Sequence, residues 1–133
     1  MLLKNNNTMS EKTKNIINWV LAGLVGFIFL GSAYGKLTGG AECSKMAESL
    51  GLNASTMTTI GVVELIAIIL FLIPRTGILG TLLLAAYMGG AIATHLEHGL
   101  PIMAPVGIAA FVWIVAVIRF PELTQRILGN NVA

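Results

Sequence analysis

Glu64, His95 and Lys36 are titratable side chains that lie within or at the ends of long apolar segments of this 133-residue sequence. A carboxylate near the middle of a membrane costs about 3 kcal/mol on insertion scales, so Glu64, in "IGVVELIAIILFLIPR", must face protein and be paired or protonated. Two interpretations stay open. Glu64 is either a neutral acid bonded to a neighbouring helix or a group that transfers protons or binds a ligand.

His95 follows the third apolar segment, in "GGAIATHLEHGLP". Imidazole exchanges protons near neutral pH, so His95 is suited to shuttling protons or donating to a ligand carbonyl, and equally to capping a helix end. We expect His95 or a bridging water to be the partner of Glu64, because the long side chain of Lys36 can extend towards the surface. Glu64 and His95 are therefore the predicted catalytic residues.

The predicted ligand-binding residues flank this pair. Lys36 is either an interface anchor or a counter-ion for an anion, and Trp113 either packs in the protein or provides a flat surface for a ligand. The full predicted ligand-binding set comprises Lys36, Tyr34, Thr94 and Trp113.

No metal site is predicted. His95 and His98 could share a helix face and join Glu64, but the helix is expected to end between them, and the sequence has no HExxH motif. The single cysteine, Cys43, excludes a CxxC pair or a disulfide within the chain.

The composition indicates a membrane protein, because 56% of the residues are hydrophobic and only 11% are charged. The net charge is +2 and the basic residues form no block, so nucleic acid is not an expected partner. The expected surroundings are a lipid bilayer.

The apolar segments predict an all-α membrane protein, a bundle of four transmembrane helices at about residues 16–37, 57–73, 77–95 and 102–120. Pro74 ends the second helix, and the short connection after it predicts a tight antiparallel hairpin. A short surface helix is expected in the loop over 38–56. The helices form one domain over 16–124, between a polar tail at 1–15 and a second tail at 125–133.

The basic residues predict that both termini, and both tails, are cytoplasmic, since Lys and Arg accumulate on that side of a membrane. This orientation collects on the cytoplasmic side Lys4, Lys12, Lys14, Arg75, Arg119 and Arg126, and leaves Lys36 and Lys45 outside. Glu64, His95 and Lys36 then share the outer half of the bundle. We therefore predict a shielded polar pocket there.

Small residues recur along one face of the third helix, at Thr81, Ala85, Gly89 and Ala93. Such a face lets helix backbones approach closely in a bilayer. It can serve packing within the bundle, a second copy of the chain or a partner subunit.

An ordered set of short motifs resembles the DoxX-like family of small four-helix bacterial membrane proteins. The set consists of Gly35-Lys36, Glu64, Pro74 with Gly77, Gly90-Ala91, Thr94-His95, and Trp113 with Arg119 and Pro121. The resemblance implies a multi-pass protein of the bacterial cytoplasmic (inner) membrane, with relatives linked to membrane oxidoreductases. It supplies no agreed catalytic residues.

The polar pocket and the resemblance together favour a subunit of a quinone-linked oxidoreductase, with a quinone as the ligand and a redox partner subunit supplying electrons. Two other hypotheses remain open. The chain could instead bind or transport another small molecule, or it could be a non-catalytic membrane subunit of a larger complex.

Overall fold

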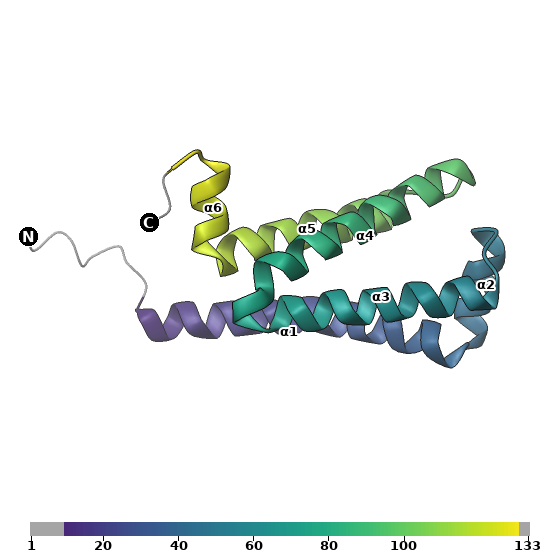
Figure 1. Cartoon of the computed structure of the whole chain (residues 1–133), viewed down its shortest axis with the longest axis horizontal. Coiled ribbons are helices and arrows are strands. Elements are labelled where there is room, and N and C mark those ends of the chain that lie inside the picture. The colour runs from purple at the N-terminus through teal and green to yellow at the C-terminus, as the bar shows by residue number, and fades with distance from the viewer. Residues whose placement is uncertain (1–9, 131–133) are drawn as a thin grey trace, which may run out of the picture.

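The computed structural model describes residues 10–130, and all its regular elements are helical (Figure 1). No β-strand occurs in this range. In chain order the elements are α1 (Glu11–Thr38), α2 (Ala41–Ser49), α3 (Ala54–Leu72), the 3₁₀ turn η2 (Pro74–Thr76), α4 (Gly77–Glu97), α5 (Met103–Arg119) and α6 (Pro121–Ile127). The all-helical fold class is confirmed, and α2 occupies the loop where a short surface helix was expected.

Three helical segments are long and apolar enough to cross a membrane: α1, α3, and η2 continued by α4. The fourth predicted span is α5, which has 17 residues and is too short to meet the length criterion for a membrane span by itself. It meets the criterion only together with α6, and the two helices are bent by 106° at the break between them. Residues 10–130 therefore contain three candidate spans, or up to four, and the fourth stays a prediction. The bend follows from Pro121, whose ring cannot continue the hydrogen-bonding pattern of α5.

Local capping explains where α1 and α3 begin. The Ser10 side chain accepts the Thr13 N–H, so α1 starts at Glu11, inside the segment expected to be a polar tail. The Asn53 side chain caps α3 in the same way. The rest of that tail, residues 1–9, and residues 131–133 of the second tail lie outside the described range.

The helices pack in a ring in which α1 contacts α3 and α5, and α4 contacts the same two helices. The ring is not parallel-sided. Figure 1 shows α4 and α5 diverging from α1 and α3 towards the end that carries α2. The start of α1, η2 and α6 lie together at the opposite end, so both described chain ends share one side of the molecule.

The divergence starts at a close contact between α3 and α4. A Cβ atom on Gly80 would lie 2.2 Å from the Phe71 backbone nitrogen, so only glycine allows the two backbones to approach this closely. Gly77 faces the Phe120 ring in a similar way, with 2.0 Å from a built Cβ to Cζ. We call the α3–α4 contact at Gly80 the apex of the bundle.

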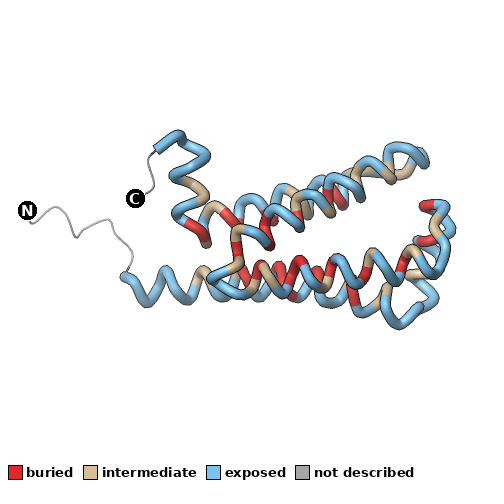
Figure 2. Tube along the Cα trace, in the orientation of Figure 1, coloured by how far each residue is buried: buried red, intermediate tan, exposed pale blue. Residues whose placement is uncertain are grey.

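Next to the apex lies a closely packed apolar core. Its buried members come from four helices and the Phe120 junction: Val25, Phe29, Ala67, Ile68, Phe71, Leu84, Met88, Val112, Val115, Ala116 and Phe120. Figure 2 shows the buried positions gathered where the helices are close, with fewer in the half that opens towards α2. The predicted small-residue face divides accordingly: Thr81 is buried in the core, whereas Gly89 and Ala93 are exposed.

Arg119 joins α5 to the end of α3. Its Nη2 donates to the Leu72 carbonyl at 2.9 Å, and its guanidinium lies 4.9 Å from the Trp19 ring centroid. The carbonyls in the last turn of a helix have no partner within that helix, so this bond satisfies a group that would otherwise be unpaired.

Candidate functional site

A cavity of about 450 Å³ occupies the half of the bundle that opens towards α2. Residues from α1, α2, α3, α4 and α5 line it, together with the turn between α2 and α3. Apolar side chains such as Ile28, Met57 and Ile108 form most of the wall. Polar groups reach the cavity from α1, α3 and α4.

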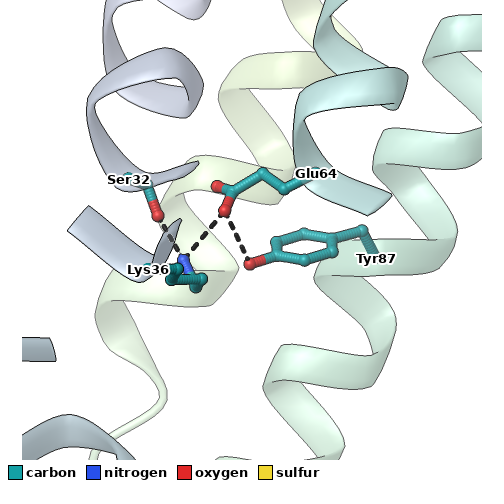
Figure 3. Close-up of polar contacts among 4 residues, drawn as sticks. All are labelled: Ser32, Lys36, Glu64 and Tyr87. Carbon is teal, nitrogen blue, oxygen red and sulfur yellow. Dashed lines mark hydrogen bonds and ion pairs between the residues drawn. The ribbon is translucent and has the colours of Figure 1, made fainter. Parts of the chain in front are cut away.

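A buried ion pair forms one part of this wall. Lys36 Nζ donates to Glu64 Oε2 at 2.9 Å, and Glu64 is only 1% exposed. Tyr87 Oη donates to the same oxygen at 3.1 Å, and Lys36 also donates to the Ser32 hydroxyl. Figure 3 shows Lys36 and Tyr87 converging on the carboxylate from different helices. We call these residues, Ser32, Lys36, Glu64 and Tyr87, the polar cluster.

The sequence explains why the members of the polar cluster meet. Ser32 and Lys36 share one face of α1, because residues four apart in a helix lie one above the other. Gly61 lies one turn before Glu64 on α3, and a Cβ there would be 3.0 Å from Lys36 Cβ, so α1 comes close to α3 at this level. Tyr87 is held from α4 with its ring edge-to-face with Phe29, at a centroid distance of 6.3 Å.

The partner of Glu64 is therefore Lys36 and not His95, contrary to our expectation. Lys36 lies in the last turn of α1 and points along the bundle to Glu64 instead of extending outward, and its side chain is 10% exposed. A lysine stem is long enough for either direction. Burial of the carboxylate makes the inward direction favourable, because an unpaired buried charge is strongly destabilising.

His95 also lines the cavity, and its Nδ1 lies 2.7 Å from the Ala91 carbonyl oxygen. A carbonyl only accepts, so Nδ1 carries the proton, and in the neutral ring Nε2 is an acceptor. We expected His95 to donate to a ligand carbonyl. In the structure the Nδ1 proton is directed to the Ala91 carbonyl of the same helix, which leaves Nε2 as the ring nitrogen without a protein partner among residues 10–130.

The other predicted site residues fall into two groups. Thr94 lines the cavity, with its hydroxyl donating to the Gly90 carbonyl at 2.8 Å. Tyr34 is 70% exposed and Trp113 is 38% exposed, and neither is among the residues lining the cavity. The structure thus brings Lys36 and Glu64 into contact, places Thr94 and His95 on the same cavity, and leaves Tyr34 and Trp113 outside it.

Sequence reasoning missed Ser32 and Tyr87. A tyrosine deep within an apolar segment is itself a signal, since membrane tyrosines concentrate at the interfaces, and the "LLLAAYMGG" context of Tyr87 is such a case. The spacing of Ser32 and Lys36 was a second signal. Both indicate polar contacts inside the bundle.

No group of three or more His, Cys, Asp or Glu side chains is placed to hold a metal ion within residues 10–130. His98 instead bonds its Nδ1 to the Thr94 carbonyl at 3.0 Å. The cavity therefore offers hydrogen-bonding groups and one ion pair.

No curated protein and no solved structure matches this chain. The model of the DoxX-like family matches residues 20–118, a range that contains all four cavity-lining residues predicted from the sequence. The chain belongs to the DoxX-like family.

Proposed function

We propose that the chain is the membrane subunit of a quinone-linked oxidoreductase and that its cavity binds the quinone head group. The observation that carries the proposal is the polar cluster, a buried Lys36–Glu64 pair held by Tyr87 on the wall of an otherwise apolar cavity. Perturbed or buried charges beside a cavity are more frequent at functional sites than elsewhere.

The dimensions and lining of the cavity suit such a ligand. Its volume of about 450 Å³ lies within the range of small-molecule sites, which combine apolar walls with a few placed polar groups. Several lining residues, among them Ala86, Gly90 and Ala104, are themselves exposed. An isoprenoid tail would pass between the helices into the bilayer at these positions.

In this proposal the chain binds and orients the ligand and exchanges protons with it, while a partner subunit carries the electrons. Glu64 and His95 are the proton-exchanging groups, and Lys36 and Thr94 are ligand-binding groups. The proposal leaves Tyr34 and Trp113 out of the site, because they do not line the cavity. The proposed location is the bacterial inner membrane.

The test is to purify the protein gently in lipid nanodiscs and quantify extracted quinone against protein. The variants are Glu64→Gln and His95→Ala, and the control is Glu97→Gln, the same chemical change at an exposed residue outside the cavity. We expect quinone to accompany the wild type and Glu97→Gln and to be lost from both cavity variants. Size-exclusion profiles separate ligand loss from misfolding.

Other outcomes would favour the alternatives. A different small molecule that accompanies the wild type and is lost from the cavity variants would favour a binding or transport protein. An empty cavity in a chain tightly bound to another subunit, with complex function unchanged in Glu64→Gln, would favour a non-catalytic subunit.

A further inference from the structure

We infer that the cavity selects ligand hydroxyl groups over carbonyl groups and so binds the reduced, hydroquinone form of its ligand more tightly than the quinone. The inference rests on the proposed function and adds to it the preferred redox form.

Most hydrogen-bond donors on the cavity wall are already used within the protein. The His95 Nδ1 proton is directed to the Ala91 carbonyl, and the Thr94 hydroxyl donates to Gly90. The Tyr87 hydroxyl donates to Glu64 Oε2. Each of these side chains can therefore only accept from a ligand in its present arrangement.

Two strong acceptors remain free. Glu64 uses Oε2 for both Lys36 and Tyr87, and Oε1 accepts no hydrogen bond from any residue in the range 10–130. Nε2 of His95 likewise has no partner within the described part of the chain. Both hydrogen bonds, from Lys36 Nζ at 2.9 Å and from Tyr87 Oη at 3.1 Å, end on Oε2, and a carboxylate oxygen is an acceptor.

The remaining donors lie together on α1. An ammonium has three protons, and Lys36 directs them to Ser32 and Glu64 with one to spare, while the Ser32 hydroxyl proton is also unassigned. A ligand hydroxyl can both accept from this pair and donate to an acceptor, and the Glu64 carboxylate is the acceptor that lies next to Lys36. A ligand carbonyl can only accept, and it would leave the carboxylate oxygen unsatisfied in a partly buried site.

The expected preference is large enough to measure. A hydrogen bond to a charged group is worth about 1.5–3 kcal/mol, so the hydroquinone should bind about ten to a hundred times more tightly. A tenfold preference raises the midpoint potential of the bound two-electron couple by about 30 mV.

The experiment compares three probes on the intact chain in nanodiscs by calorimetry: a short-chain benzoquinone, its hydroquinone kept reduced anaerobically, and the dimethyl ether of that hydroquinone. The ether keeps the ring but has no hydroxyl protons and needs no reductant. We expect the hydroquinone to bind at least tenfold more tightly than the other two. In Glu64→Gln both forms should bind more weakly, and the hydroquinone should lose more affinity than the quinone because an amide donor replaces an acceptor, so the preference should fall towards equality. In Glu97→Gln the preference should be unchanged.

The outcomes distinguish this inference from the proposed function. If the quinone or the ether binds as tightly as the hydroquinone, the inference is overturned and the quinone site stands. If no probe binds at all, the proposed function fails as well. If Glu64→Gln does not fold, His95→Phe removes the other acceptor, and an undiminished preference in that variant overturns the role assigned to His95.

Discussion

One carboxylate oxygen of Glu64, Oε2, accepts hydrogen bonds from both the Lys36 ammonium and the Tyr87 hydroxyl. These two bonds determine how much free energy is lost when a member of the polar cluster is replaced. A buried ion pair contributes little net stability compared with well-packed apolar residues, because both charges lose their hydration. Removing one partner is different, since it leaves the other charge buried and unpaired. The polar cluster is therefore costly to break and of little benefit to stability, which is typical of a group kept for function.

The first prediction concerns the coupling within this pair. Lys36→Met should lower the free energy of unfolding by about 3–5 kcal/mol, because the Glu64 carboxylate loses its counter-ion. Adding Glu64→Gln to Lys36→Met should recover a large part of that loss, because no buried charge remains. Unfolding by SDS in mixed micelles measures both variants. Additive effects of the two substitutions would contradict the pairing.

A second prediction concerns Tyr87. Tyr87→Phe keeps the ring against Phe29 but removes the hydrogen bond to Glu64, so it should cost about 1.5–3 kcal/mol of unfolding free energy. Tyr34→Phe is the matched control, because the Tyr34 side chain is 70% exposed, and it should change stability by less than about 0.5 kcal/mol. Equal effects in the two variants would show that the Tyr87 hydroxyl contributes nothing.

At the scale of the helices, the dominant feature is the apex, where α3 and α4 touch at Gly80 and then diverge. Close contact at one end and divergence at the other create the space for the cavity. In the exposed half of the small-residue face, a Cβ atom on Gly89 would meet no neighbouring helix within 4 Å among residues 10–130, and Ala93 is exposed. Small residues on one helix thus have two different environments.

The third prediction compares two glycines of α4. Gly80→Ala places a methyl group against the Phe71 backbone and should destabilise the protein by about 1–3 kcal/mol or more, because α3 and α4 must separate. Gly89→Ala has no atom within 4 Å of the new methyl group and should be neutral or stabilising by up to about 1 kcal/mol, from helix propensity alone. Melting temperatures in detergent compare them; a Gly80→Ala protein as stable as Gly89→Ala would contradict the apex contact.

The helices could be predicted from the sequence because long apolar segments and prolines are local signals. The segment expected at 57–73 is helical over Ala54–Leu72, and the one expected at 77–95 over Gly77–Glu97. Contacts between helices were harder to predict. Whether Lys36 turns inward to Glu64 depends on how closely α1 approaches Gly61 of α3. The divergence of α4 from α3 depends on the close contact at Gly80. Neither feature follows from the residue pattern of a single segment.

For the molecule as a whole, the distribution of polar groups defines two unlike ends. One end carries the start of α1, η2 and α6 with Arg75, Arg119 and Arg126, and the other carries α2 and the cavity (Figure 1). Lys36 and Lys45 are the basic residues towards the other end, in α1 and α2. From the distribution of Lys and Arg we predict that both termini are cytoplasmic.

The fourth prediction tests this orientation. In a Cys43→Ser background, Ser44→Cys introduces an exposed thiol on α2 and Asn130→Cys introduces one beyond α6. A membrane-impermeant maleimide added to intact spheroplasts should label the α2 position, and the position beyond α6 only after permeabilisation. The reverse pattern would place the termini outside.

The cavity lining ends at Ile28, Glu64, Ala86 and Ile108, and beyond this level the closely packed core and the apex fill the bundle. The packed side chains of the core therefore close the cavity at the end that carries η2 and α6, and the cavity opens on the side of α2. Oxidation of a hydroquinone in this cavity would release both protons on that side. The chain by itself would then move no proton across the membrane, and any charge separation would come from the route the electrons take.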